Sequence, residues 1–129
     1  MTERQRYRRK PNQVVAAVQL KLDTQGFAYR KWGGEQHCKG GDWLVDNDGD
    51  VYTVAADSFA RTYRRQAPGQ YLKITPIWAE RAATPGDIKT FEGRTQYQVG
   101  DYLVSNNEDG SDAYAIAAAK FEAMYELDA

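Results

Sequence analysis

Two stretches of this 129-residue chain decide its expected fold: Gly41-Asp42-Trp43-Leu44-Val45 and, 59 residues later, Gly100-Asp101-Tyr102-Leu103-Val104. The same separation sets residues 15–18 against residues 74–77, and Asn47 against Asn106. Three further residues in the second copy then change the separation to 62, which matches Tyr52, Phe59 and Tyr63 with Tyr114, Phe121 and Tyr125. This self-similarity indicates two copies of one unit of about sixty residues.

Each copy is predicted to contain a strand, a long loop, a β-hairpin and a short helix. In the first copy, the strand is residues 14–20 and the Gly-rich loop is residues 21–40. The hairpin consists of strands 43–46 and 51–54 around the turn Asp48-Gly49. The helix begins at Asp57 or Ser58. In the second copy they are residues 71–78, the loop 79–98, strands 102–105 and 113–117 around a longer turn, and a helix over 118–127.

The predicted fold class is α+β, a tandem repeat of two strand–loop–β-hairpin–short-helix units. A unit of this size is too small to bury a good core alone, so we expect the two to pack with pseudo-two-fold symmetry. This predicts a basic N-terminal arm at residues 1–10 and a single domain over 11–129, made of repeat one (11–66) and repeat two (67–129).

The composition excludes several classes of protein. With 42% hydrophobic and 27% charged residues, the chain is expected to fold rather than to be disordered. One His and one Cys cannot build a zinc motif from those residue types alone, and neither Gly-rich nucleotide-binding motif is present, so no metal site and no cofactor is predicted. The lone Cys38, the lack of a long apolar run and the lack of a secretory signal predict a cytoplasmic protein without a membrane span.

The repeated pairs Gly41-Asp42 and Gly100-Asp101 allow two interpretations. In the structural one, glycine adopts a left-handed turn and aspartate accepts hydrogen bonds from nearby backbone N–H groups. In the functional one, Asp42 and Asp101 meet across the pseudo-dyad and hold a metal or divide acid and base roles. We favour the structural interpretation because a fold element recurs with each copy, whereas an active site need not.

Candidate ligand-binding residues come from the aromatic and basic side chains. The loop residues Tyr29, Arg30, Lys31 and Trp32 combine both characters, which suits an anionic or aromatic ligand. Trp43 and Tyr102 occupy matched positions in the two copies, and their rings carry a polar edge that often faces a pocket.

The N-terminal segment supplies candidate phosphate contacts. Residues 1–10 have a local charge of +4, from five basic side chains and one acidic one, whereas residues 101–129 have −6, from one basic and seven acidic ones. Such a basic stretch can bind nucleic acid, but the isoelectric point of about 5.8 favours a solvated arm with Tyr7 on the core. The candidate contacts are Arg4, Arg6, Arg8, Arg9 and Lys10.

Residues 7–63 resemble small phage- and prophage-encoded proteins of unassigned function. The shared features are Tyr7-Arg8-Arg9-Lys10-Pro11, the following strand, the Gly41-Asp42-Trp43 hairpin and the segment from Asp57 to Tyr63. The hairpin is also similar to that of proteins named for a Pro-Gly-Asp-Tyr-Gly motif. In this chain, Gly40 and Val99 stand in place of the Pro, and Leu44 and Leu103 stand in place of the last Gly. The resemblance implies a phage-like or accessory bacterial protein and brings no reaction or catalytic residue.

Three functional hypotheses follow. The leading one is a non-enzymatic module that binds an unknown small molecule or protein, at the seam between the repeats or at loop 26–40. The second is an enzyme with a carboxylate site at Asp42 and Asp101. The third is a nucleic-acid accessory protein that uses the basic arm. No catalytic residue is assigned.

Overall fold

The computed structural model describes residues 4–90 and 93–128, and the fold is mostly β, with 52% of the chain in strands and 11% in helices. The predicted α+β class is therefore wrong. The difference arises largely in the two predicted loops, because each contains a β-hairpin. No helix of the described ranges has the length and apolar character needed to cross a bilayer.

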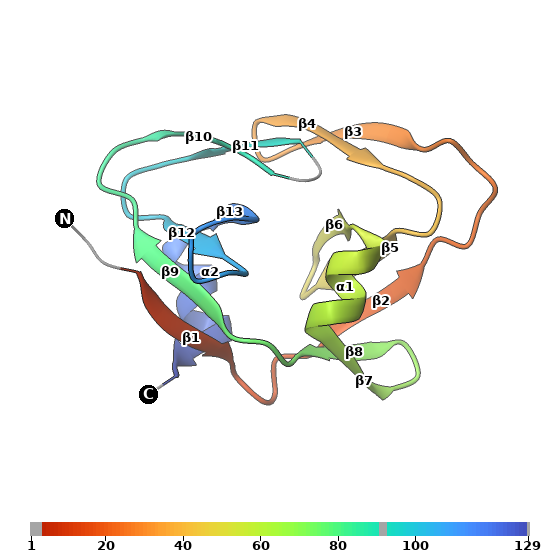
Figure 1. The fold of residues 1–129 in the computed structure, drawn as a ribbon, viewed down its shortest axis with the longest axis horizontal. Helices are drawn as coiled ribbons and strands as arrows, with labels where there is room; N and C mark the ends of the chain where they lie inside the picture. Colours follow the sequence, from red (N-terminus) through yellow and green to blue (C-terminus); the bar gives the residue numbers. More distant parts are fainter. Residues whose placement is uncertain (1–3, 91–92, 129) are drawn as a thin grey trace.

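Two antiparallel five-stranded sheets lie side by side in Figure 1. The first sheet has the order β6-β5-β2-β8-β7, from β2 (Val15–Gln19), β5 (Trp43–Asn47), β6 (Asp50–Val54), β7 (Tyr63–Ala67) and β8 (Gln70–Lys73). The second has the order β13-β12-β9-β1-β14, from β1 (Gln5–Arg9), β9 (Ile77–Arg81), β12 (Tyr102–Ser105), β13 (Ala113–Ile116) and β14 (Tyr125–Leu127). Helix α1 (Ala56–Thr62) joins β6 to β7, and helix α2 (Ala118–Met124) joins β13 to β14.

The strands of the two sheets correspond, but the first strand does so in a different register from the predicted one. Gln19 pairs with Trp43, and Arg81 pairs with Tyr102, so β2 corresponds to β9 at a separation of 62 rather than 59. Residues 71–78 are not one strand: β8 ends at Lys73 and β9 begins at Ile77, because Pro76 lacks the N–H that a continuous ladder needs. The predicted boundary at 66/67 falls inside β7.

Residues 5–9 do not form a solvated arm. They are β1, which pairs with β9 on one side and with β14 on the other. The alternation of side chains along the strand explains this placement, because Tyr7 packs against the core while its neighbours Arg6 and Arg8 face outward. Arg6 lies 3.1 Å from Asp128, and Arg8 lies 2.8 Å from Glu126. The basic segment and the acidic C-terminal residues therefore neutralise each other within one sheet.

Each sheet has its own aromatic core. Phe59 of α1 stacks on Trp43 at 4.0 Å between ring centres, and Phe121 of α2 stacks on Tyr102 at 3.9 Å. Both phenylalanines are buried, as the sequence predicts, with 2% and 1% of their surface exposed. The two clusters are separate, so the space between the sheets is not filled by an apolar core.

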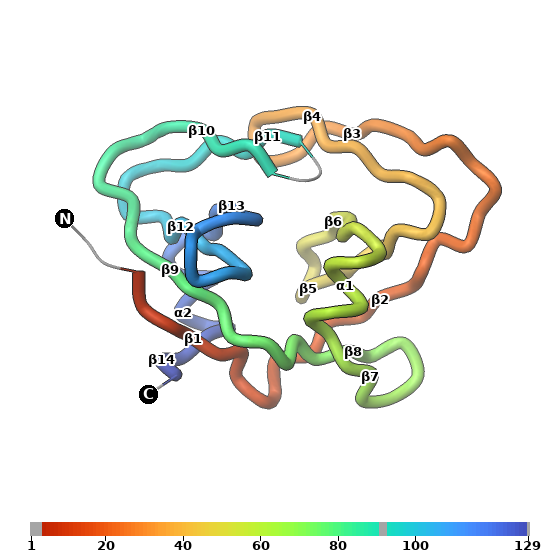
Figure 2. Tube along the Cα trace, viewed as in Figure 1, coloured from red at the N-terminus to blue at the C-terminus, as the bar shows by residue number. Residues whose placement is uncertain are grey.

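Two hairpins arch over that space and meet above it (Figure 2). They are β3 (Phe27–Lys31) with β4 (Gly34–Cys38), and β10 (Gly86–Lys89) with β11 (Arg94–Tyr97). They are held together by backbone contacts, because Gln96 N–H donates to Trp32 C=O at 2.8 Å and Gln36 forms a bridge with Gly93. The Gln36 side chain is fully buried between them and donates to the carbonyl oxygens of Lys31 and Arg94.

Candidate functional site

A cavity of about 570 Å³ lies between the two sheets, beneath the hairpins; we call it the central cavity. Both sheets contribute to its wall through polar side chains at matching positions. These are Arg9, Asn47, Tyr52, Tyr63, Lys73, Asn106, Tyr114 and Tyr125. An enclosed space with convergent buried polar groups is the usual form of a small-molecule site.

Arg9 crosses from one sheet to the other. It lies on β1 in the second sheet, and its Nη2 donates to Asn47 Oδ1 on β5 of the first sheet at 2.9 Å. Its Nε donates to the carbonyl oxygen of Gln13 at 2.8 Å, and its guanidinium carbon lies 5.4 Å from the centre of the Tyr125 ring. Only 5% of Arg9 is exposed, so this charge is held by neutral oxygens and an aromatic face.

Lys73 makes the corresponding crossing in the other direction. It lies on β8 of the first sheet, and its Nζ donates to Asn106 Oδ1 at 2.7 Å and to the Tyr114 hydroxyl at 3.0 Å, both in the second half. Lys73 is 6% exposed. Burial lowers the pKa of the Lys73 amine and Arg9 adds to this, against the opposing effects of Tyr125 and Asp112.

Neither of the two buried cations has a carboxylate as a direct partner. Within residues 4–90 and 93–128, neither Arg9 nor Lys73 forms an ion pair. Asp50, which lines the same cavity, is already paired with Lys31 and Lys120. Asp101 and Asp112 also line the cavity, and Asp112 acts on Lys73 through space. The positive charge is therefore local to Arg9 and Lys73 rather than a property of the whole cavity.

The tyrosines respond to this environment in two ways. Burial raises the pKa of Tyr52, Tyr63 and Tyr114. Burial also acts to raise the pKa of Tyr125, but the facing Lys73 and Arg9 outweigh it and the net direction is downward. Opposite shifts of like groups in one cavity mark it as a candidate binding or catalytic site.

Of the four loop residues predicted to bind a ligand, one lines the central cavity. Trp32 reaches it from the hairpin tip, with its ring 5.5 Å from that of Tyr52. The other three lie elsewhere: Lys31 is paired with Asp50 at 2.8 Å, the Tyr29 hydroxyl is 2.7 Å from Thr53 Oγ1, and Arg30 is exposed at the surface. Trp43 and Tyr102 belong to the two aromatic cores.

Asp42 and Asp101 each bind backbone N–H groups of their own half. Asp42 accepts from Lys39 at 3.0 Å and from Ala56 at 3.2 Å, and Asp101 accepts from Gln98 at 2.9 Å. The preceding Gly41 and Gly100 have φ values of 91° and 89°, which favour glycine. The two carboxylates line different cavities, so the structure does not bring them together.

The predicted phosphate contacts do not form one surface. Arg6 and Arg8 are paired with acids of the C-terminal strand region, and Arg4 lies 4.0 Å from Glu80. Lys10 donates to the carbonyl oxygen of Glu122 at 3.0 Å. Arg9 alone of these five lines the central cavity.

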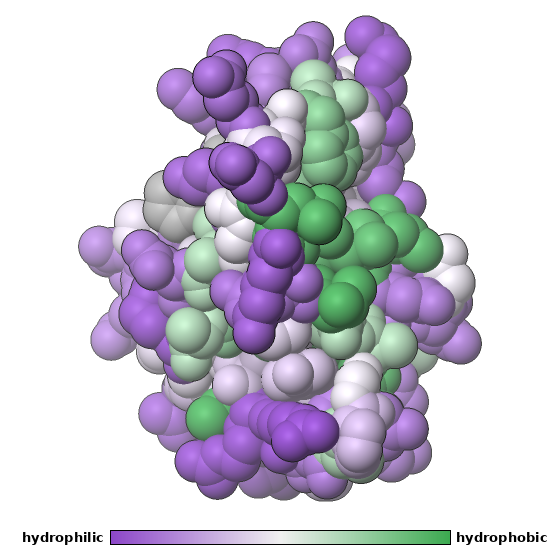
Figure 3. All heavy atoms as spheres, turned by 90° about the vertical axis from the view of Figure 1, so that its right-hand side faces the viewer, coloured by the Kyte–Doolittle hydropathy of each residue, from purple (hydrophilic) through white to green (hydrophobic). Residues whose placement is uncertain are grey.

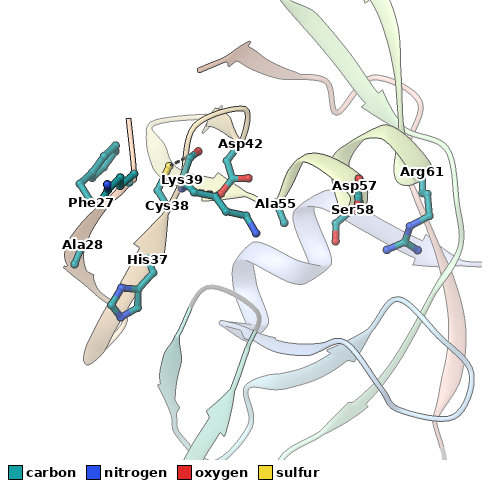
Figure 4. Close-up of a pocket in the computed structure, with 12 residues that line it drawn as sticks. Phe27, Ala28, His37, Cys38, Lys39, Asp42, Ala55, Asp57, Ser58 and Arg61 are labelled. Atoms are coloured by element: carbon teal, nitrogen blue, oxygen red, sulfur yellow. Dashed lines mark hydrogen bonds between the residues drawn. The ribbon is translucent and has the colours of Figure 1, made fainter. Parts of the chain in front are cut away.

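A second cavity of about 780 Å³ lies between β4 and α1. Figure 4 shows its side chains spread along a line from Phe27 to Arg61 rather than gathered around one point. Its wall mixes Lys39 and Arg61 with Asp42 and Asp57. Within the described ranges, no three His, Cys, Asp or Glu residues are placed to hold a metal ion. This cavity is the weaker candidate.

Apolar side chains also gather on the outer side of the first sheet. Val18 and Leu44 face each other across β2 and β5 and are 56% and 36% exposed. Figure 3 shows apolar side chains exposed on this side of the molecule, surrounded by polar ones. Such a patch is the kind of surface that protein partners use.

Comparison with known proteins gives no match. No protein-family model matches the chain, and neither a curated protein nor a solved structure is significantly similar to it. The function must therefore be argued from the central cavity.

Proposed function

We propose that this chain is a small-molecule binding module that takes an anionic ligand into the central cavity, as a phage-like or accessory bacterial protein of the cytoplasm. The observation that carries the proposal is the pair of buried cations, Arg9 and Lys73, which have amide, hydroxyl and carbonyl oxygens as partners. An anion between the sheets would supply the charge that these residues lack.

The physical argument is one of desolvation. Removing a cation from water costs several kcal/mol, and neutral hydrogen-bond partners return only part of it. Two such cations in one cavity also repel each other, which is why Arg9 contributes to lowering the pKa of Lys73. A carboxylate or phosphate would form charge-assisted hydrogen bonds with both and remove the repulsion.

The cavity wall indicates the rest of the ligand. Trp32, at the tip of the β3–β4 hairpin, lies beside Tyr52 of β6, and apolar side chains of β6 and β13 continue the wall. Aromatic rings bury large apolar area and pack well on flat groups. We therefore expect a ligand with one anionic head and a planar or apolar body.

The two alternatives have less support. An enzyme site shared by Asp42 and Asp101 needs the carboxylates in one cavity, and they line different ones. A nucleic-acid arm needs basic side chains without acidic partners, and Arg6 and Arg8 are paired with Asp128 and Glu126.

The test compares anions with neutral molecules of the same shape. The two pairs of probes are benzoate with its neutral counterpart benzamide, and phenyl phosphate with its neutral counterpart phenol. Each compound is added separately to four proteins, and the melting temperature is recorded. The proteins are the wild type, Lys73→Met, Arg9→Met and the surface control Lys21→Met. We expect the anions to raise the melting temperature of the wild type and of Lys21→Met, because a ligand that binds the folded state alone stabilises it. Equal effects of anions and neutral molecules, or an undiminished effect in both cavity variants, would refute the proposal.

A further inference from the structure

Among the described residues, two lysines line the central cavity, and they are held differently. Lys120 is paired with the Asp50 carboxylate, and a third of its side chain is exposed. Lys73 is buried and donates to the neutral oxygens of Asn106 and Tyr114. A carboxylate partner holds an amine in its protonated form, whereas burial among neutral groups lets the amine lose its proton more readily and so reach the uncharged, nucleophilic form.

We propose that Lys73 condenses reversibly with the carbonyl group of a small 2-oxo acid to form an imine, while Arg9 holds the carboxylate of that acid. The carboxylate part rests on the proposed function, because it uses the same anion site. Arg9 suits this role since its planar fork matches a carboxylate. Arg9 already donates from Nε to Gln13 C=O and from Nη2 to Asn47, which fixes the plane of the guanidinium, so a carboxylate would have to approach from the Nη1 side.

Imine formation requires protons to move between the Lys73 amine and the carbonyl oxygen, and a hydroxyl beside Lys73 can carry them. The Nζ lone pair attacks the carbonyl carbon, a C–N bond forms, and the former carbonyl oxygen takes up a proton. The nitrogen then loses one proton, the hydroxyl takes up a second proton and leaves as water, and the nitrogen lone pair forms the C=N bond. Loss of the remaining N–H proton from this iminium gives the neutral imine. The Tyr114 hydroxyl, 3.0 Å from Nζ, can pass protons in both directions.

Two features of the site favour the product. Asn106 Oδ1, 2.7 Å from Nζ, fixes the position of the amine, and Asn106 is itself held by a 2.7 Å hydrogen bond to Asp112. The hairpins arch over the gap between the sheets (Figure 2), and their residues Trp32, Thr90 and Thr95 line the cavity beneath. Such a cover reduces access of the water that would hydrolyse the imine.

The test is reductive trapping on the folded protein. Wild-type protein is incubated with pyruvate and sodium cyanoborohydride, which reduces an imine to a stable secondary amine, and peptide mass spectrometry locates the label. Acetone, which has the same carbonyl but no carboxylate, is the matched probe. We expect Lys73 to be labelled at least about tenfold faster than exposed lysines, which corresponds to about 1.4 kcal/mol in the barrier, and this preference to vanish in urea.

Variants separate the possible outcomes. Lys73→Arg keeps the charge and should abolish the label at this site, whereas Lys120→Arg should leave it unchanged, with circular dichroism as the check on folding. Label spread evenly over all lysines of the native wild type would overturn the imine, even if benzoate still stabilised the protein. Equal labelling of Lys73 by acetone and pyruvate would overturn the 2-oxo acid, and the benzoate experiment would then decide whether anion binding also fails.

Discussion

Arg9 and Lys73 occupy equivalent positions in the two sheets. Each lies two residues after a tyrosine, Tyr7 or Tyr71, and each pairs in register with the tyrosine that follows a helix: Arg9 with Tyr125, and Lys73 with Tyr63. Each then reaches across to an asparagine of the other half. The two halves are therefore joined by two buried cations rather than by an apolar seam, which makes the interface sensitive to charge.

The first prediction concerns the pH dependence of stability. The pKa of Lys73 is lowered in the folded protein, so between that value and the unfolded value of 10.5 the unfolded chain binds more protons. The free energy of unfolding then rises with pH, by at most about 1.4 kcal/mol per pH unit for one group. Urea titrations give the free energy of unfolding of the wild type and of Lys73→Met at each pH. We expect the difference between the two proteins to change in favour of the wild type as the pH rises from neutral toward the unfolded pKa of 10.5.

Other groups limit the window for this measurement. Tyr125 has a lowered pKa and changes stability with the same sign, because Lys73 and Arg9 favour its phenolate. Tyr52, Tyr63 and Tyr114 have raised pKa values and destabilise the fold above their ordinary value of 10.0. The titration therefore stops below that pH. Parallel stability curves for wild type and variant would show that Lys73 does not titrate in this range.

The second prediction concerns the two aromatic cores. Phe59→Ala and Phe121→Ala should each lower the free energy of unfolding by about 3–5 kcal/mol, because both rings are buried and stacked. Val99→Ala is the control, since Val99 is 63% exposed and should change stability by less than about 0.5 kcal/mol. Denaturant unfolding measures all three. A loss below about 1 kcal/mol at either phenylalanine would mean that its core is not tightly packed.

The sequence predicts the elements whose local signals agree with the fold. Asp48-Gly49 forms the expected hairpin turn, with φ values of 53° and 91°, and helix α1 begins at Ala56, beside the predicted Asp57. The β3–β4 hairpin was missed because its turn is Trp32-Gly33, with φ values of 56° and 77°. A tryptophan seldom adopts positive φ, so its presence gave no turn signal.

The candidate site was harder to predict than the fold. The recurrence of Asn47 and Asn106 is visible in the sequence. So is the occurrence of a basic residue two positions after Tyr7 and after Tyr71. The burial of Lys73 was not predictable, because lysine on a strand is usually solvated and the face that it occupies depends on the break at Pro76. The partners of Arg9 depend on pairing across the whole chain, between β1 and the last strand.

The third prediction concerns β1. Tyr7 packs edge-on against Phe121, with 4.9 Å between ring centres, on a strand that is paired on both sides in the second sheet. Tyr7→Ala should therefore lower the free energy of unfolding by about 2–3 kcal/mol. Arg8→Ala, one residue away, removes an exposed ion pair with Glu126 and should cost less than about 1 kcal/mol. Equal small losses in both variants would support a loosely attached segment instead of a strand integrated into the sheet.

The fourth prediction compares the two repeated aspartates. Asp42 is 3% exposed and accepts hydrogen bonds from two backbone N–H groups, whereas Asp101 is half-buried and accepts from the Gln98 N–H. Asp42→Ala should cost about 2–3 kcal/mol and Asp101→Ala about 1 kcal/mol, because buried donors without a partner are expensive. Asp42→Asn keeps an acceptor oxygen and should recover part of the loss in thermal melts. The reverse order of losses would contradict this account.

The fifth prediction concerns access to the central cavity. Gly34 lies against the backbone carbonyl of Arg94, so a Cβ at this position would force the two hairpins apart. Gly34→Ala should speed hydrogen exchange at Gln36 and change Trp32 fluorescence, because both residues lie at the contact. Glu35→Ala is the control, since its side chain is 55% exposed. If the hairpins close the cavity, benzoate should bind and leave Gly34→Ala faster than wild type in stopped-flow measurements. If hydrogen exchange shows that the hairpins have separated but the rates of benzoate binding and release are unchanged, the ligand enters by another route.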